Sequence, residues 1–224
     1  TITGIYVFIG LPFRIALSLG LALLLNQKLK GVSFFRTIFY SPTVVSGVAL
    51  AVLWMWMFNP DFGLINRLLA LVGITGPDWL FSEQWALPAI ILMSLWGAGG
   101  NMIIYLGGLQ GIPTTLYEAA ELDGAGWWNK FFHITIPMLT PIIFFNLIVG
   151  IINNFQVFTQ AFVMTNGGPN NATLFYVLYL YNNAFRFFKV GYASAMAVVL
   201  FLIILALTIV LIRTSDRWVH YEGA

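Results

Sequence analysis

The amino-acid sequence predicts an all-α protein that crosses a membrane about five times. Only 8% of the 224 residues are charged and 60% are hydrophobic, whereas about a quarter of an ordinary soluble domain is charged. One water-facing core does not hide that much apolar surface. The apolar residues also form continuous runs, such as AVVLFLIILALTIVLI, without the alternation of β-barrel strands. The fold class is therefore helical and polytopic.

About five apolar runs are long enough to cross a bilayer, which takes about 20 helical residues. They cover residues 4–25, 38–58, 85–107, 138–162 and 192–212. A turn-rich loop, TNGGPNNAT, precedes a further aromatic stretch at 175–188. That stretch is short for a span, so we expect a helix lying in the membrane interface there.

The basic residues predict the orientation of the chain. One side of the runs carries most of them, namely Lys28, Lys30, Arg36, Lys130, Arg213 and Arg217. The positive-inside rule places this side in the cytoplasm, together with the C-terminus, and places the N-terminus outside. The chain opens at Thr1 without a basic segment or a cleavage site. We therefore expect a first span to be missing; a five-span protein with an exported N-terminus is the alternative.

Two further composition features exclude classes of function. The net charge is only +2 and the basic residues are scattered, so there is no nucleic-acid-binding surface. The chain has no cysteine, which removes disulfides, thiolate metal sites and cysteine nucleophiles.

The longest polar cytoplasmic stretch lies at 111–137 and predicts two short helices. Thr115 and Glu118 have the spacing of a capping box, which begins a helix over 116–122. Gly124 supplies the left-handed residue that ends this helix. A second helix follows over 127–134 and stops at Pro137, which opens the next span.

The residues of this loop resemble the EAA loop of the membrane subunits of binding-protein-dependent ABC importers. The resemblance lies in Glu118, Ala119 and Ala120, in Gly124, and in the sequence ITIP at 134–137, where Ile136 stands in place of the usual Leu. The stretches at 34–56, 116–128 and 164–173 are similar to the sugar-importer branch, in particular to the maltose-permease-like first subunit of a heterodimeric pair. The resemblance implies a type I ABC importer permease fold with six core spans, so that residues 1–224 form one transmembrane domain without its first span.

The resemblance also implies how the loop acts. In this family the EAA helix docks into a cleft of a cytoplasmic ATPase subunit, and the coupling residues in this chain are Glu118, Ala119, Ala120, Asp123 and Gly124. Alanines allow close approach, and a carboxylate suits a basic partner. The alternative for Glu118 is that it only completes its capping box, while Gly124 ends the helix in any case.

The implied partners follow from the same resemblance. The chain has no G-x-x-x-x-G-K-[ST] loop, so it is not an enzyme and binds no cofactor; ATP and Mg belong to two separate ATPase subunits. A second permease, an extracytoplasmic solute-binding protein and a sugar complete the system, in a bacterial inner membrane.

Neutral polar residues and glycines inside the runs predict the solute pathway. In the fourth run Asn146, Gly150, Asn153, Val157 and Gln160 recur at steps of three and four. The pathway residues predicted from three runs are Thr43, Gly47, Gly97, Asn101, Asn153, Asn154 and Gln160. Amides donate and accept hydrogen bonds, as carbohydrates require, and aromatic faces are available from Trp96, Phe155 and Phe158. The alternative is that these groups only pack helices together.

Arg14 is the unusual charge, because it lies near the middle of the first run and no acid within the runs pairs with it. A carbonyl, water, the missing span or the companion permease are its candidate partners, and an anionic solute is a further alternative. A stand-alone secondary transporter or channel for a small polar solute is the competing function. The spans hold neither a metal cluster nor a catalytic set, so no metal site and no catalytic residue is predicted.

Overall fold

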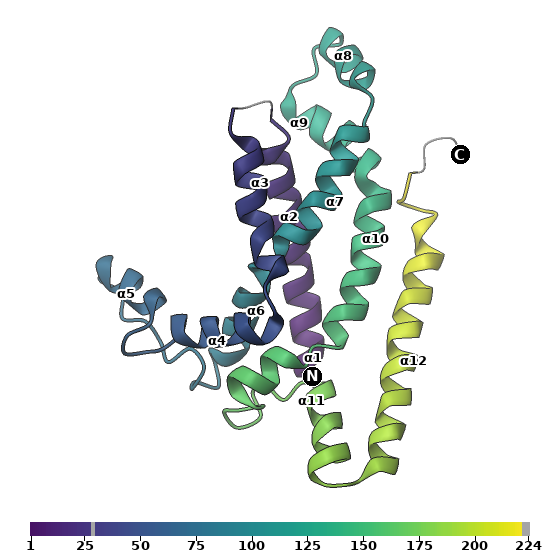
Figure 1. Ribbon diagram of the computed structural model, residues 1–224. Helices are drawn as coiled ribbons and strands as arrows, with labels where there is room; N and C mark the ends of the chain where they lie inside the picture. The colour runs from purple at the N-terminus through teal and green to yellow at the C-terminus, as the bar shows by residue number, and fades with distance from the viewer. Residues whose placement is uncertain (28–29, 221–224) are drawn as a thin grey trace.

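The computed structural model describes residues 1–27 and 30–220, and all regular elements within these ranges are helices (Figure 1). The α-helices are α1 (Ile2–Ile5), α2 (Leu11–Leu25), α3 (Val32–Tyr40), α4 (Gly47–Met57), α5 (Leu64–Leu71), α6 (Ala86–Leu95), α7 (Ala98–Gly111), α8 (Thr114–Leu122), α9 (Trp127–Lys130), α10 (Ile136–Phe155), α11 (Tyr176–Tyr181) and α12 (Val190–Ser215). π-Helical segments cover Tyr6–Gly10, Phe131–Thr135, Ala161–Thr165 and Asn182–Arg186, and a 3-10 turn covers Ser41–Val44. The predicted all-α class is confirmed.

Three continuous helices are long and apolar enough to cross a membrane: Ile2–Leu25, Trp127–Phe155 and Val190–Ser215. Two bent pairs, α3 with α4 and α6 with α7, bring the number of candidate spans to as many as five. The described helices therefore agree with the predicted number of crossings. The aromatic stretch after the outer loop forms α11 and the π-helical segment Asn182–Arg186, which together are too short to span.

The second predicted run, 38–58, is not one straight span. Helix α3 begins at Val32, and the chain turns by 102° between Val32–Val44 and Gly47–Met57. Pro42 lies in the 3-10 turn, where it cannot donate a backbone hydrogen bond, and Val45 and Ser46 take extended conformations (ψ 135° and 136°). Hydrophobicity alone predicted the run, but these residues break it.

The fourth predicted run, 138–162, is displaced toward the N-terminus. One helix runs from Trp127 to Phe155, so the predicted stop at Pro137 was wrong, and so was the extension to residue 162. In the π-helical segment before the proline the Ile136 amide bonds to the Phe131 carbonyl, five residues back. This wider turn directly precedes Pro137, which lies in the first turn of α10, and the helix continues through the proline.

Helix α2 is the centre of the bundle and contacts α7 most extensively. Buried side chains along α2 and the π-helical segment before it are separated by three, four or seven residues, as expected for one face of a helix. They are Val7, Leu11, Ser18, Ala22 and Leu25. Helix α10 lies beside α2 and α7, and α12 packs against α10 (Figure 1). Helices α4 and α5 project sideways from this bundle, α8 lies at one end, and the turn between α11 and α12 lies at the other.

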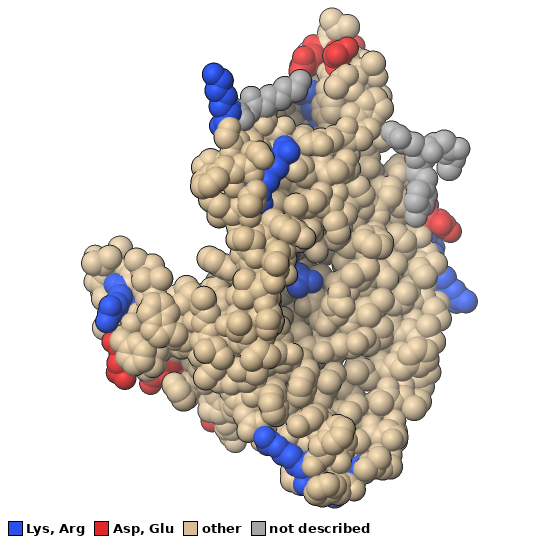
Figure 2. Space-filling view, in the orientation of Figure 1, with Lys and Arg blue, Asp and Glu red and all other residues tan. Residues whose placement is uncertain are grey.

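Charged side chains gather at the two ends of the molecule, on the α4–α5 arm and on the edge where α12 ends (Figure 2). The broad band between them is almost uncharged, apart from a recessed patch of basic surface in the hollow beside the arm. Large exposed apolar side chains cover α12, for example Phe201 and Leu202. This distribution suits a molecule whose middle lies in lipid.

Candidate functional site

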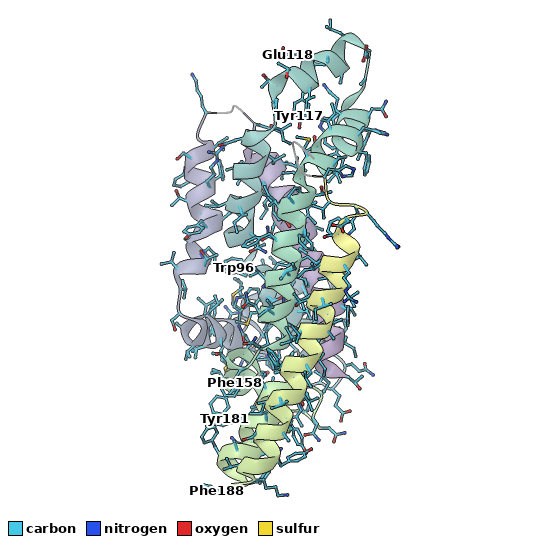
Figure 3. The ribbon with its side chains drawn as sticks, turned by 90° about the vertical axis from the view of Figure 1, so that its right-hand side faces the viewer. Trp96, Tyr117, Glu118, Phe158, Tyr181 and Phe188 are labelled. Carbon is cyan, nitrogen blue, oxygen red and sulfur yellow. The ribbon has the colours of Figure 1, made fainter. Side chains whose placement is uncertain are left out.

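The loop at 111–137 places α8 apart from the bundle at one end of the molecule (Figure 3). None of the side chains of α8 is buried. Among the predicted coupling residues, Glu118, Ala119, Asp123 and Gly124 are exposed and Ala120 is half-buried. The structure therefore brings these five positions together on one accessible helix and its C-terminal turn.

The predicted capping box at the start of α8 is absent. The helix begins at Thr114, with Pro113 as its N-cap, and no side chain caps it. The extended backbone of Pro113 (ψ 128°) starts the helix one residue before Thr115, so the Thr115 hydroxyl is not at the N-cap position that the motif requires. Glu118 therefore presents an exposed carboxylate that the predicted cap does not engage. The left-handed conformation predicted for Gly124 is confirmed by its φ of 77°.

Two side-chain contacts join α8 to the helical residues that directly precede α10. The sequence did not indicate either contact. The Tyr117 hydroxyl and the Thr135 hydroxyl lie 2.9 Å apart, and Thr135 is buried directly before α10. Lys130 and Glu121 form an ion pair at 2.7 Å, which contributes little because Glu121 is largely exposed. The Tyr117–Thr135 contact is the more buried of the two and links the loop to a membrane helix.

The polar stripe predicted on the fourth run is divided by the end of α10 at Phe155. Asn154 and Asn146 are buried, and each amide donates to the carbonyl one turn back, Asn154 to Gly150 at 2.7 Å and Asn146 to Ile142 at 2.9 Å. Asn153 is exposed on α10, whereas Gln160 follows the break. The stripe is therefore not one continuous helix face.

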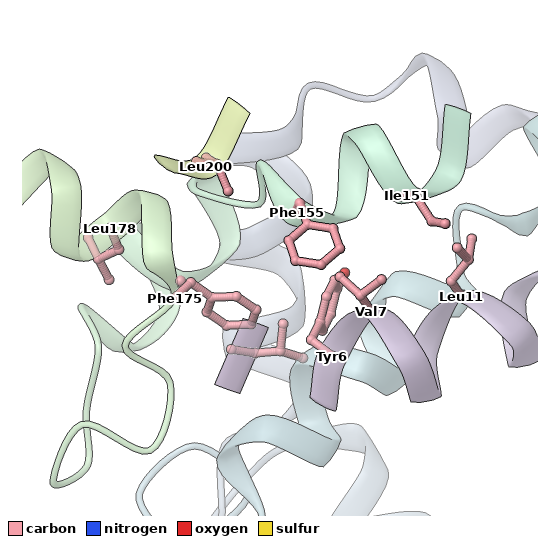
Figure 4. Close-up of a cluster of buried hydrophobic side chains, with 10 residues drawn as sticks. Tyr6, Val7, Leu11, Ile151, Phe155, Phe175, Leu178 and Leu200 are labelled. Carbon is pink, nitrogen blue, oxygen red and sulfur yellow. The ribbon is translucent and has the colours of Figure 1, made fainter. Parts of the chain in front are cut away.

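The three aromatic residues predicted to face the solute, Trp96, Phe155 and Phe158, also differ in their surroundings. Phe155 is only 8% exposed and belongs to a core cluster with Tyr6, Val7 and Leu200 (Figure 4). Phe158 stacks on Phe162 with ring centroids 5.2 Å apart. Of these three candidates, only Trp96 is exposed over half of its surface, at 50%.

Trp96 lies in a cavity of about 480 Å³ between α2, α3, α4 and the α6–α7 joint. Its lining residues are Leu17, Leu21, Ile38, Phe39, Pro42, Trp54, Met57, Ile65, Leu92, Leu95, Trp96, Ala98 and Gly99. The bend between α3 and α4 and the joint between α6 and α7 meet here, because Pro42 lies at the first and Trp96 at the second. Both breaks were invisible to a search for long apolar runs.

The remaining predicted pathway residues lie around these breaks. Gly97 forms the joint between α6 and α7, and Asn101 is half-buried one turn along α7. The Thr43 methyl lies beside Gly100 of α7, while Gly47 faces Thr159. The structure therefore groups Thr43, Gly97 and Asn101 near the crossing of α3 and α7, and keeps Asn153 on α10.

Within residues 1–27 and 30–220 there is no group of three His, Asp or Glu side chains that could hold a metal. The arrangement instead combines an apolar helical bundle, neutral polar groups beside helix breaks, and an exposed helix at one end. These features define a membrane permease subunit.

Comparison with known proteins assigns the family. Residues 6–221 match the family described as "Binding-protein-dependent transport system inner membrane component". The chain belongs to this family, which confirms the resemblance drawn from the EAA loop, and it is a transport subunit of an ABC importer, not an enzyme.

Individual relatives agree with this assignment. The chain is 45% identical over 99% of its length to the probable ABC transporter permease protein YesP of Bacillus subtilis, covering 73% of that protein. It is 39% identical over 92% of its length to the lactose transport system permease protein LacF of Rhizobium radiobacter, covering 71%. A permease chain in the crystal structure of a bacterial alginate ABC transporter, in complex with an alginate pentasaccharide-bound periplasmic protein, superposes with a TM-score of 0.84 at 25% identity, covering 97% of this chain and 75% of that one.

Proposed function

We propose that this permease forms half of a sugar pathway and pairs with a second, different permease subunit. Two cytoplasmic ATPase subunits drive the pair with ATP and Mg, and an extracytoplasmic binding protein delivers the sugar. Relatives named for lactose and alginate support a carbohydrate solute. The observation that carries the proposal is α8, an exposed helix with an accessible Glu118 and a partly buried contact to Thr135, directly before α10.

Coupling then works by differential stabilisation of two conformers. An ATPase cleft that holds α8 more tightly in one state shifts the equilibrium toward that state. The Tyr117–Thr135 contact passes the movement of α8 to the base of α10. The coupling residues are Glu118, Ala119, Ala120, Asp123 and Gly124.

The pathway residues are proposed with different roles. Thr43, Gly47, Gly97 and Asn101 surround the breaks in the helices, where non-helical backbone at membrane depth is expected to be shielded from lipid. Asn153 and Gln160 offer amides that are not buried. The Asn154 amide donates to the Gly150 carbonyl of its own helix, so we expect it to support the helix that lines the pathway without contacting the solute.

The proposed orientation puts α8 and the C-terminus in the cytoplasm, in a bacterial inner membrane. It rests on the basic residues at that end, Lys30, Arg36, Lys130, Arg213 and Arg217. The turn between α11 and α12 then faces outward, toward the binding protein.

Co-purification tests the proposed function. The tagged chain, expressed with its genomic neighbours, should retain an ATPase chain and a second permease, and should take up sugar only with ATP. Glu118→Ala should lower ATP-driven uptake at least tenfold by the loss of about 1.5–3 kcal/mol of charged hydrogen bonding. Asp61→Asn, an exposed acid on the α4–α5 arm, is the matched control.

Two outcomes contradict the proposal. A chain that carries solute without an ATPase is a secondary transporter or channel. Full transport activity of the Glu118→Ala importer would show that this carboxylate has no coupling role.

A further inference from the structure

Helix α12 lies at the edge of the bundle and packs loosely along its length (Figure 1). Only 11% of the residues in its apolar stretch are buried, against 28% and 33% for the other two continuous spans, Ile2–Leu25 and Trp127–Phe155. Cavities of about 900 Å³ and 550 Å³ border the helix, and Leu200 lines both. A helix with so few packed side chains depends on its ends for its position relative to the bundle.

The two ends of α12 are attached in different ways. Near the N-terminal end, the Tyr176 hydroxyl of α11 donates to a backbone carbonyl of α12 at 2.9 Å. At the C-terminal end the attachment comes from the tail that follows the helix, residues 216–220. The Trp218 and Val219 amides bond to the Ser215 carbonyl at 3.0 and 2.8 Å. These bonds turn the tail at the end of α12.

The tail contacts α10 through one polar and one apolar contact. The His220 amide donates to the Thr140 hydroxyl at 2.9 Å. The Trp218 and Phe144 rings meet edge to face, with centroids 5.8 Å apart. Thr140 and Phe144 are four residues apart and therefore share one face of α10. Val219, between the two contacts, is only 8% exposed. The tail is thus fixed along one turn of α10.

The Thr140 hydroxyl lies at a proline interruption of α10. Pro141 is inside the helix and has no N–H, so the carbonyl four residues before it, that of Pro137, lacks its usual helical donor. The Thr140 hydroxyl donates to that carbonyl at 2.6 Å. Because a hydroxyl has a single proton, it faces the tail as an acceptor, which is what the His220 N–H requires. Thr140 therefore joins the tail to the interrupted first turn of α10.

The predicted coupling loop contacts the chain at nearly the same place. Tyr117 of α8 lies against Thr135, which comes two residues before Pro137. The loop and the tail are therefore attached to adjacent turns at the start of α10. A movement that enters at Thr135 reaches the tail contact within five residues of continuous helix.

We propose that the tail is a latch that makes α12 follow the start of α10 when α8 moves, and that Thr140 and Trp218 are positioning residues for coupling. This rests on the proposed function. Without the latch, movement of α8 would reach α10 alone, because the middle of α12 has few packed side chains to carry it. With the latch, the two helices move as one unit.

Spin-label distances in the assembled importer, with cysteine-free partner subunits, test the latch. The chain has no cysteine, so Phe145→Cys on α10 and Ile209→Cys on α12, both exposed, accept one label each. A second pair, Leu122→Cys on α8 and Leu24→Cys on α2, reports movement of α8. Both distances are compared between the nucleotide-free complex and the complex trapped with ATP and vanadate. The α8–α2 distance should change on trapping, while the α10–α12 distance stays the same.

Variants connect this behaviour to the latch residues. Thr140→Val removes the hydroxyl at nearly constant size, and Trp218→Ala removes the ring contact. Each should shift the α10–α12 distance in the trapped complex, because α12 no longer follows α10. Thr140→Ser and Trp218→Phe should restore the original distance, since they keep a hydroxyl and a ring. Thr214→Val is the matched control, because the Thr214 hydroxyl donates within α12.

Several results would overturn the latch. One is an α10–α12 distance that changes on trapping in the unmodified chain, and another is an α8–α2 distance that does not change. Thr140→Val and Trp218→Ala complexes that unfold at lower temperature but keep the α10–α12 distance would show a purely structural contact. In each of these cases an importer that retains its ATPase keeps the proposed function. A chain that retains no ATPase contradicts the proposed function itself, and the latch with it.

Discussion

At the scale of single residues, the most informative position is Gly124. Its φ of 77° lies in the left-handed region, and a Cβ there would meet no atom within 4 Å. Its amide bonds to the Glu121 carbonyl at 3.0 Å, and the Ala125 amide bonds to the Ala120 carbonyl at 2.8 Å. The turn therefore sets the direction in which the chain leaves α8 solely through its backbone conformation.

Gly124→Ala should strain this turn by about 1–2 kcal/mol and reduce ATP-driven uptake while leaving expression intact. Gly126→Ala is the matched control, because Gly126 has a φ of −70° and equally open surroundings. Gly124→Asn should retain more activity than Gly124→Ala, because asparagine tolerates the left-handed region. Equal uptake by the two alanine variants would show that the conformation of residue 124 does not matter.

The amides show the limit of prediction at this scale. Asn153 and Asn154 are adjacent and chemically identical, so the sequence assigned both to the pathway. In the structure Asn154 is buried and bonds to Gly150, whereas Asn153 is exposed. The angle of 100° between successive helical residues decides which amide faces the bundle.

At the scale of elements, the breaks in the helices position the cavity. The chain turns by 102° between α3 and α4 and by 40° between α6 and α7. Helices α3 and α7 are held together at Gly99, where a Cβ would overlap the Phe39 carbonyl oxygen. That contact is between backbones, so a flexible side chain cannot relieve it.

Gly99→Ala should therefore separate α3 from α7 and destabilise the permease by about 1–3 kcal/mol. Thermal unfolding of the purified complex measures the effect. Gly107→Ala, on the same helix but with nothing within 4 Å, should leave the midpoint nearly unchanged. A Gly99→Ala midpoint equal to that of the control would contradict the close approach.

At the scale of the whole molecule, α8 and the turn before α12 lie at opposite ends (Figure 3). Leu122 at the end of α8 is 91% exposed and Phe188 at the other end is 81% exposed. Because the chain has no cysteine, one introduced thiol at either position reports its side of the membrane without background.

A membrane-impermeant maleimide added to intact spheroplasts should label Phe188→Cys but not Leu122→Cys. Permeabilised cells should show labelling of both, and the cysteine-free chain should show none. The reverse pattern in intact cells would invert the proposed orientation and place the proposed coupling residues outside, away from the cytoplasmic ATPase subunits.

The sequence by itself determined the helical membrane class, the approximate number of crossings and the family, because hydrophobic length and the EAA spacing are local properties of the chain. It located the loop proposed for coupling but misplaced the start of α8, since Pro113 and not Thr115 sets the N-cap. Only the tertiary structure decided where helices break, which amides are buried, and which residues line the cavity that holds Trp96. Those properties depend on contacts between residues far apart in the chain, such as Ser18 with Ala98 and Leu11 with Gly150, and no short window of sequence contains them.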